Sequence, residues 1–395
     1  MKRREFVKGS LTASAALYAT TTFGLGGIKG ANETINIGII GTGDRGGGMI
    51  PIINAIPNLR VVACCDIIPF RLQEALAKID GKAKAYTDYQ KLLEDNNVDA
   101  VLIATPFSTH SQIAIDALDA NKHVYCEKTL AKGHENIERL VKKADASNNI
   151  FQTGHQYHSS RLYTYIVEEI NKGTIGNITA FECQWNRNGD WRRSSPDPKW
   201  EKLINWRMYR EYSGGLLAEL CSHQLDFVNW VLDATPEKVM GIGGIDYWKD
   251  GRETYDNIHL IYSYPNGVKA TFTCLTSNGM GDYKIKVLGD KGSYILDYVK
   301  AWYYPEGSYQ REVGEVDGVS GATVNWDQGK GIPIEVVHDD PSKQALIDFR
   351  DGIVNNEEPI SNIHSGAKAA RCVQMGLDAM YGQKIMEWAS PVLSE

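Results

Sequence analysis

The sequence predicts an α/β N-terminal domain with a parallel sheet, followed by an α+β domain with a large, mainly antiparallel sheet. Three observations support this prediction. Between residues 35 and 152, short apolar runs alternate with helical patterns, which is typical of a parallel sheet covered by helices on both faces. A glycine-rich turn follows the first of these runs. Beyond residue 178, strand-like runs follow one another with few helices between them, which favours antiparallel pairing.

Length and composition are typical of a two-domain globular chain. The 395 residues suggest two domains, which we place at residues 32–152 and 153–385. The net charge of −7, with no basic stripe, argues against nucleic acid as a partner. The seven cysteines show no metal-like spacing, so we interpret them as small buried apolar residues without a disulfide framework.

The first 31 residues have the layout of a signal peptide, with a basic start and a mildly apolar stretch rich in Ala and Thr. The pattern Arg3-Arg4-x-Phe6-x-Lys8 resembles the twin-arginine export signal. The sequence therefore predicts export to the periplasm. A stretch this short and polar is a poor membrane span, so no stable span is expected. The alternative, a frayed basic N-terminus, is disfavoured by the paired arginines.

The first predicted strand, residues 35–40, leads directly into a glycine-rich turn. The turn is Gly41-Thr42-Gly43-Asp44-Arg45-Gly46. A G-x-G-x-x-G pattern between a strand and a helix suits a dinucleotide, because the glycines allow a tight turn, close approach of the pyrophosphate and close helix packing. The helix N-terminus adds free N–H groups and a positive dipole end. We expect the helix to begin near Gly47, which would put Pro51 in its first turn.

The second predicted strand, residues 59–65, ends at Asp66. This residue lies 20 positions after Gly46, the spacing expected for an acid that binds the ribose hydroxyls. A carboxylate at this position repels a 2′-phosphate, so NAD is predicted as the cofactor and NADP is disfavoured. The alternative is an ordinary glycine-rich turn with a solvated aspartate, which the matching spacing makes less favourable.

The remaining elements of the first domain continue the alternation. Strands are predicted at 83–86, 99–105, 122–126 and 150–153, and helices at 69–79, 88–96, 109–120 and 133–147. Cofactor contacts in such sheets lie where strands end. The candidates at these positions are Thr105, Pro106, His110, Glu127 and Lys128. From the pattern alone, a lysine such as Lys128 at the end of a strand is more commonly a solvated residue at the rim of the sheet than a placed catalytic group.

The second domain is predicted to contain one large sheet. Its strands are expected at 178–186, 237–246, 257–264, 268–275, 282–288 and 292–297, and two helical patterns within 341–385 close the fold. Residues 187–212 form a loop rich in Trp and Arg, including Trp191 and Arg192. This loop is either a substrate rim with aromatic platforms or a packing and interface loop, and the sequence does not separate the two.

Several motifs together resemble the Gfo/Idh/MocA family of NAD(P)-dependent oxidoreductases. They are the glycine turn with Asp66, Ala104-Thr105-Pro106 with His110, Glu127-Lys128-Thr129, Gly154-His155-Gln156-Tyr157-His158, and the segment from Gly214 to Asp226. The resemblance covers residues 35 to 385. It implies hydride transfer between the cofactor and a hydroxyl or keto group of a sugar, sugar derivative or polyol. It also implies a homo-oligomer, a dimer or tetramer, whose interface often lies on the second sheet.

The resemblance also implies the catalytic residues, which are Lys128, Glu219 and His223. We assign His223 as acid/base, Glu219 as its partner or as an acceptor for a substrate hydroxyl, and Lys128 as oxygen stabiliser and proton relay. Glu219 and His223 are four residues apart and would share a helix face. The chain departs from the usual family pattern twice. Thr129 replaces a proline, so the turn loses its rigid φ, and Glu219 replaces an aspartate.

The pocket at the domain junction is expected to bind the substrate. We expect His155, Tyr157 and His158 to reach it, along with Trp191, Arg192, Glu219 and His223. The His/Tyr/His cluster lacks a third ligand at a fixed spacing, so no metal is predicted.

Three functions remain open. A compartment beyond the cytoplasmic membrane has no free NAD pool, so an exported enzyme would carry its cofactor and regenerate it on the protein. This suits an oxidoreductase, and also an NAD-dependent glycosidase that works by transient C3 oxidation and elimination. The hydrolase ranks second because the motifs common around the lysine of those relatives are absent. A non-catalytic sugar- or NAD-binding module is disfavoured by the retention of all three catalytic residues.

Overall fold

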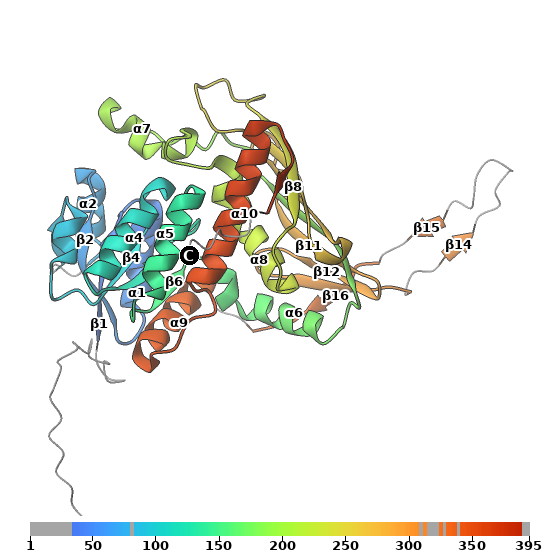
Figure 1. The fold of residues 1–395 in the computed structure, drawn as a ribbon, viewed down its shortest axis with the longest axis horizontal. Coiled ribbons are helices and arrows are strands. Elements are labelled where there is room, and N and C mark those ends of the chain that lie inside the picture. The colour runs from blue at the N-terminus through green and yellow to red at the C-terminus, as the bar shows by residue number, and fades with distance from the viewer. Residues whose placement is uncertain are drawn as a thin grey trace, which may run out of the picture.

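The computed structural model describes residues 34–79, 83–307, 311–313, 324–326, 329–337 and 340–388. The expected signal peptide, residues 1–31, lies outside these residues. Two lobes lie side by side, each built on its own large sheet (Figure 1). Within the described part of the chain, no helix is both long enough and apolar enough to cross a membrane.

The first sheet confirms the predicted parallel arrangement. Its strands are β1 (Ile35–Ile40), β2 (Leu59–Cys65), β3 (Lys84–Tyr86), β4 (Ala100–Ile103), β5 (His123–Cys126) and β6 (Phe151–Thr153). They lie in the order β3-β2-β1-β4-β5-β6, and every pair is parallel. The order reverses between β1 and β4. The carboxyl ends of these two strands therefore border the crevice in which such sheets bind ligands.

Helices cover this sheet as expected, with one correction. They are α1 (Asp44–Asn54), α2 (Pro69–Leu76), α3 (Tyr89–Leu93), α4 (His110–Asp119) and α5 (His134–Asp145). Helix α1 begins at Asp44 rather than near Gly47, so Pro51 lies in its interior. Proline has no N–H to donate to the Gly47 carbonyl. The Lys78 ammonium replaces that donor at 3.0 Å, which removes the cost of an unpaired carbonyl.

The second sheet has nine strands and is mainly antiparallel, as predicted. They are β7 (Ile178–Asn186), β8 (Lys238–Gly244), β9 (Asn257–Ser263), β10 (Lys269–Leu275), β11 (Tyr283–Gly289), β12 (Gly292–Leu296), β13 (Ala301–Pro305), β16 (Ile332–Ile334) and β17 (Met386–Glu387). Their order is β16-β13-β12-β11-β7-β10-β9-β8-β17, with a single parallel pair between β7 and β10. A separate antiparallel pair is formed by β14 (Arg311–Val313) and β15 (Val324–Trp326).

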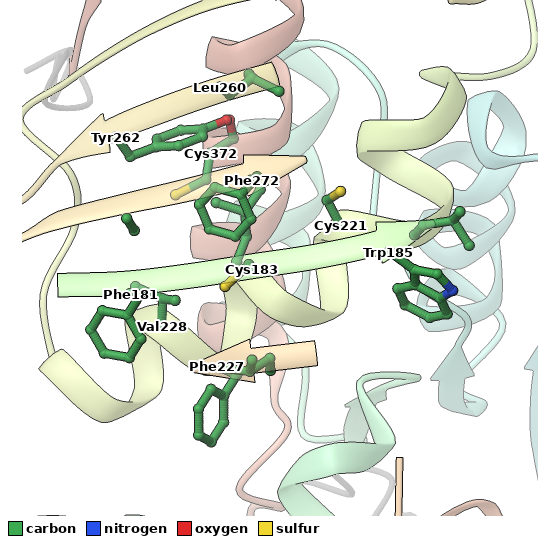
Figure 2. Close-up of a cluster of buried hydrophobic side chains, with 14 of the residues drawn as sticks. Phe181, Cys183, Trp185, Cys221, Phe227, Val228, Leu260, Tyr262, Phe272 and Cys372 are labelled. Carbon is green, nitrogen blue, oxygen red and sulfur yellow. The ribbon is translucent and has the colours of Figure 1, made fainter. Parts of the chain in front are cut away.

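The core of the second lobe lies between this sheet and the helices that cover its inner face. The remaining helices are α6 (Arg161–Asn171), α7 (Glu201–Ile204), α8 (Ser222–Leu232), α9 (Pro341–Asn355) and α10 (Ile363–Gly382). Figure 2 shows Phe181 and Cys183 of β7 in the same cluster as Phe227 of α8 and Phe272 of β10. Alternate residues of β10 are buried, as expected for a strand with one covered face. All seven cysteines are buried and free, as the sequence predicted.

The two C-terminal helices join the lobes. Helix α9 packs on the first lobe, where the Phe349 ring meets the edge of Tyr125 at 5.7 Å. The first half of α10 packs on the first lobe through Ile363 and Ala367, and its second half packs on the second lobe through Val373. The first domain is therefore completed by residues far beyond position 152.

Candidate active site

A cavity of about 920 Å³ lies between the two lobes. Its walls come from the glycine-rich turn, the carboxyl ends of β2 and β4, the segment 187–212 and helix α8. Residues expected to bind cofactor, bind substrate and perform catalysis therefore border one space. Its volume lies within the range of about 300–1,000 Å³ that is typical of small-molecule sites.

The glycine turn has the geometry that a dinucleotide needs. Gly41 has a φ of +87°, and a Cβ there would lie 2.8 Å from the Ala104 carbonyl. A Cβ on Gly46 would lie 1.9 Å from the Gly41 oxygen. Helix α1 can therefore pack against the turn only because Gly46 has no side chain. No side chain caps the N-terminus of α1, so the turn and the helix end fit a pyrophosphate group.

Asp66 stands at the end of β2 and lines the cavity. Its Oδ2 accepts hydrogen bonds from the backbone N–H of Thr42 at 2.8 Å and from its hydroxyl at 3.2 Å, and Oδ1 accepts from the Ile68 N–H at 2.9 Å. Thr42 is buried and does not line the cavity, so it positions the acid. Arg71, which sequence reasoning missed, reaches over Gly43: a Cβ there would lie 2.9 Å from its guanidinium.

Asp44 and Arg45, at the start of α1, both line the cavity and both form ion pairs. The Arg45 Nε lies 2.6 Å from Glu127 Oε1. Burial alone would lower the pKa of Arg45, but the Glu127 carboxylate outweighs this effect, so the pKa of Arg45 is raised above its usual value. Asp44 pairs at 2.6 Å with Arg193, which belongs to the loop 187–212 of the second domain. That loop is therefore tied to the cofactor turn.

Thr105, Pro106 and His110 follow β4 and line the cavity. The His110 ring is buried, with Nδ1 2.9 Å from the Thr129 carbonyl oxygen and Nε2 2.9 Å from the Thr105 carbonyl oxygen. Burial lowers the pKa of this histidine. His110 thus connects the loop after β4 to the turn that contains Lys128, and its main effect is to position both.

Lys128 lies in the cavity wall, and its ammonium donates to the backbone carbonyl of Glu219 at 2.6 Å. Burial lowers the pKa of Lys128, although Glu219 and Glu127 oppose the shift. Because Thr129 replaces the proline that is usual in the family, we expected the turn after Lys128 to lose a rigid constraint. Hydrogen bonds supply one instead, since the Thr129 hydroxyl donates to the Ala218 carbonyl at 2.8 Å and His110 contacts the Thr129 carbonyl.

Glu219 lines the cavity, but its carboxylate pairs with Arg207 and Ser213 and not with His223, which corrects the first of its two expected roles and leaves that of acceptor for a substrate hydroxyl. Its carboxylate accepts from Arg207 Nε at 3.1 Å and from the Ser213 hydroxyl at 3.3 Å. Residues Leu217–Cys221 form a π-helical turn. Because hydrogen bonds there span five residues, side chains four apart no longer align as in an α-helix.

His223 lies in the first turn of α8 and lines the cavity with an exposed fraction of 5%. The Trp185 ring centroid lies 6.0 Å from it and the Tyr157 centroid 5.1 Å. Burial first, and the Lys128 charge second, hold the pKa of His223 well below its usual value. The imidazole is therefore neutral near pH 7 and able to accept a proton.

The expected substrate contacts of His155, Tyr157 and His158 do not fit their positions. None of the three lines the cavity, whereas Gln156 does. They form a buried layer behind His223, where His158 Nε2 lies 2.8 Å from Asp226 Oδ2. The short 3₁₀ segment Gln156–Ser159 turns the Tyr157 side chain into the core of the second lobe and not toward the cavity.

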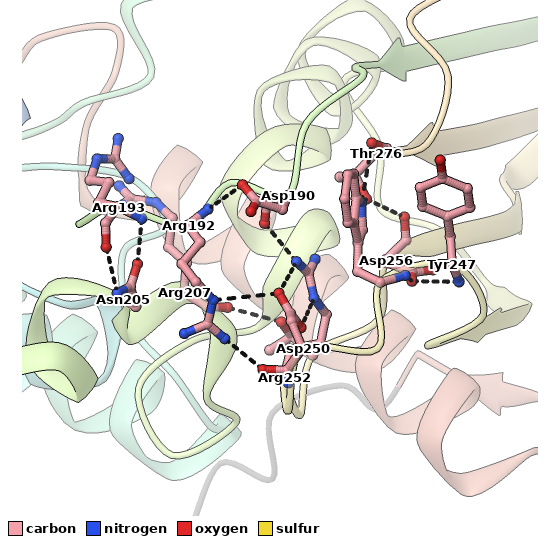
Figure 3. A network of polar contacts seen from close by, with 12 residues as sticks. Asp190, Arg192, Arg193, Asn205, Arg207, Tyr247, Asp250, Arg252, Asp256 and Thr276 are labelled. Carbon is pink, nitrogen blue, oxygen red and sulfur yellow. Dashed lines mark hydrogen bonds and ion pairs between the residues drawn. The ribbon is translucent and has the colours of Figure 1, made fainter. Parts of the chain in front are cut away.

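In the loop 187–212, Trp191 lines the cavity and Arg192 does not. Figure 3 shows the Arg192 side chain among Asp190, Asp250 and Arg252. Arg192 forms ion pairs with Asp250 and with Glu201. The cavity-lining residues that sequence reasoning did not assign to the site include Arg71, Gln156, Trp185, Arg187, Arg193, Trp206, Arg207 and Tyr212. Only the loop's richness in Trp and Arg hinted at some of them. Across the described ranges, no three His, Cys, Asp or Glu side chains are grouped to hold a metal ion.

Comparisons with known proteins agree with this geometry. Residues 35–155 match the profile described as oxidoreductase family, NAD-binding Rossmann fold, and residues 167–387 match that family's C-terminal alpha/beta domain. The myo-inositol 2-dehydrogenase of Thermotoga maritima is 28% identical over 271 residues, which cover 67% of this chain and 76% of that protein.

Two further relatives broaden the comparison. The 2,7-anhydro-N-acetylneuraminate hydratase of Mediterraneibacter gnavus is 31% identical over 212 residues, 54% of this chain and 53% of that protein. A solved levoglucosan dehydrogenase in complex with NADH and L-sorbose shares the fold, with a TM-score of 0.71, 17% identity and coverage of 91% of this chain and 100% of that one. The chain belongs to the Gfo/Idh/MocA oxidoreductase family, and its first domain is the family's NAD-binding Rossmann domain.

Proposed function

We propose that this NAD-dependent oxidoreductase acts on a secondary hydroxyl, or the corresponding keto group, of a sugar, sugar derivative or polyol. The observation that best supports this is the meeting of Lys128, Glu219 and His223 with the glycine turn around one cavity. Relatives named for inositol and levoglucosan act on compounds of this class.

The residues divide the work of alcohol oxidation between them. NAD, when bound, supplies the hydride acceptor. His223 is neutral near pH 7 because its pKa is low, so it takes the proton from the substrate hydroxyl. Lys128 uses one N–H on the Glu219 carbonyl and donates another to the substrate oxygen, where it stabilises developing negative charge. The Glu219 carboxylate, held by Arg207, accepts from a neighbouring substrate hydroxyl.

A second candidate is the hydrolase that oxidises, eliminates and reduces back on one bound cofactor. The likeness to two 2,7-anhydro-N-acetylneuraminate hydratases favours it, because those proteins are named for a net reaction without redox change. The same three residues would serve both reactions, and only the products differ.

Export is part of the proposal. The Arg3-Arg4-x-Phe6-x-Lys8 pattern supports a twin-arginine route to the periplasm, and the pair between Asp44 and Arg193 supports retention of cofactor loaded beforehand. A reporter fused to residues 1–40 should be exported, and Lys substitution of the two arginines should abolish that export. Export that survives the substitution would refute the route.

A homo-oligomer, dimer or tetramer, is also proposed. Met240 and Ile242 on β8 expose 53% and 73% of their surface, which suits an interface on the second sheet. Light scattering on the purified protein tests this directly, and a monomer at working concentration would refute it.

The decisive experiment measures cofactor and substrate together. The purified protein is denatured and the released NAD(H) is quantified by mass spectrometry, while sugars and polyols are screened for reduction of the nicotinamide. The oxidoreductase is supported if a sugar reduces the nicotinamide in the wild-type protein. This reduction should be lost in Lys128→Ala and kept in Lys172→Ala, a control at an exposed lysine. Cleaved sugar without net reduction supports the hydrolase instead. Binding of cofactor and sugars without any turnover would leave only the binding module.

A further inference from the structure

Arg187 stands in the cavity wall directly after β7, in the same space as Lys128 and His223. Its backbone N–H donates to the Leu275 carbonyl at 2.7 Å, which fixes the main chain there. The guanidinium carbon lies 5.4 Å from the ring centroid of Trp185 and 5.8 Å from that of Trp191. Two indole rings therefore hold the cation in place without neutralising it.

The other arginines of the second-domain wall are balanced by carboxylates. The pairs are Arg193 with Asp44 and Arg207 with Glu219. Arg187 forms no ion pair with any carboxylate in the part of the chain that the structure describes. Its polar neighbour is the phenol of Tyr298, whose pKa burial raises to about 12, so that group is uncharged near pH 7. The positive charge at this end of the cavity therefore forms no ion pair with a described carboxylate, although Asp282 also acts on the Tyr298 phenol.

Trp185 gives a second indication. Its indole lines the cavity with an exposed fraction of 6%, and Nε1 makes no well-aligned hydrogen bond within the described residues, although the Tyr298 phenol that neighbours Arg187 also lies beside it. A buried donor without an acceptor is costly unless a ligand supplies one. The Trp185 ring centroid lies 6.0 Å from that of His223, so this acceptor would belong to the molecule that reacts there.

We propose that the substrate is a sugar acid, and that Arg187 and the Trp185 N–H bind its carboxylate while His223 and Lys128 act on a hydroxyl. This rests on the proposed function. A guanidinium and an adjacent N–H donor suit a planar carboxylate, which arginine binds through two parallel hydrogen bonds. One unpaired guanidinium balances the single charge of a carboxylate, whereas a phosphate ester would bring nearly two charges.

Binding can be tested without turnover, because three tryptophans line the cavity and their fluorescence reports occupancy. The NAD-loaded protein is titrated with glucuronate and galacturonate, with glucose and galactose as neutral partners, and with glucose 6-phosphate. Arg187→Met keeps an apolar stem between the indoles and removes the charge, and Arg187→Lys keeps the charge. Arg161→Met is the control, since Arg161 is exposed and lies outside the cavity.

Wild type and Arg161→Met should bind at least one uronate about tenfold to a hundredfold more tightly than its neutral partner. Arg187→Met should lose this preference while binding neutral sugars as before, and Arg187→Lys should keep part of it. Equal binding of acid and neutral sugars by wild type, or a preference that survives Arg187→Met, overturns the inference, and so does tighter binding of the phosphate. If uronates bind through Arg187 but none is oxidised, the proposed oxidation fails while the acid site stands.

Discussion

Three consecutive glycines of α1 allow a graded test of how the helix meets the cofactor turn. Changing Gly46, Gly47 or Gly48 to alanine adds the same single carbon at each position. That carbon would lie 1.9 Å from the Gly41 oxygen at position 46 and 2.8 Å from the Thr42 oxygen at position 47, and it would meet nothing within 4 Å at position 48. The three variants therefore differ in contact and not in chemistry.

The magnitudes follow from these distances. Ordinary contact begins at 3.4 Å, so Gly46→Ala forces α1 and the turn apart by about 1.5 Å. Overpacking of this kind costs about 1–3 kcal/mol or more, and the displaced turn should lose NAD affinity as well. Gly48→Ala lies in a helix interior without contacts and should stabilise by up to about 1 kcal/mol. Gly47→Ala should fall between the two.

The assay is urea unfolding followed by circular dichroism, with NAD binding measured by calorimetry on the same samples. The expected order of stability is Gly48→Ala, wild type, Gly47→Ala, Gly46→Ala. If Gly46→Ala does not fold, the order of the other two still tests the geometry. Wild-type stability and affinity in Gly46→Ala would refute the close approach, and a destabilised Gly48→Ala would show that α1 does not run through this position.

The site gives four more testable outcomes. Lys128→Ala should lower kcat by about 10²- to 10⁴-fold, as for loss of a proton-transfer group, and a near-normal rate would contradict its role. Asp66→Ala should bring kcat/KM with NADP close to that with NAD; unchanged selectivity would remove this carboxylate from the ribose site. Arg193→Ala should speed NAD release by about 1.5- to 5-fold in stopped-flow experiments, because its ion pair is largely exposed, and an unchanged rate would mean that the pair does not retain cofactor. Asp226→Asn should cost about 3–5 kcal/mol of unfolding free energy, since it breaks a buried pair with His158. Burial raises the pKa of Asp226, but His158 outweighs burial, so the pKa of Asp226 in the folded protein is lowered. The pair therefore stabilises the fold fully above the ordinary pKa of 3.8, and this stabilisation is lost as the pH falls through the lowered pKa. A stability difference between Asp226→Asn and wild type that persists in acid would argue against the charge pair.

Much of the fold could be predicted because it depends on local patterns. The strands β1, β2 and β7 begin and end where their apolar, β-branched or alternating runs do. The start of α1 could not be predicted, since it depends on the distant Lys78 ammonium satisfying the Gly47 carbonyl. The strand β17 is only two residues long and exists because it pairs with β8, so its own sequence gave no signal.

The site residues likewise include some that local sequence predicts and some that depend on distant contacts. Asp66 and Lys128 were predictable because they occupy strand ends whose positions follow from local sequence. The choice between the neighbours Arg192 and Arg193 was not predictable. It depends on which distant carboxylate each one meets, and only Arg193 meets one on the wall of the cofactor turn.

Helix α10 explains how a cavity between two domains can keep a fixed shape. This one helix contributes Ile363 and Ala367 to the core of the first lobe, and Val373 and Leu377 to the core of the second lobe. A hinge between the lobes would have to pull one half of this helix out of a core, which exposes buried apolar surface at about 25 cal/mol per Å². Gly366 tightens the joint, because a Cβ there would lie 2.4 Å from the side chain of Thr153 at the end of β6. Opening of the cavity is therefore expected in the loop 187–212, held to the first lobe by surface contacts, and not between the two sheets.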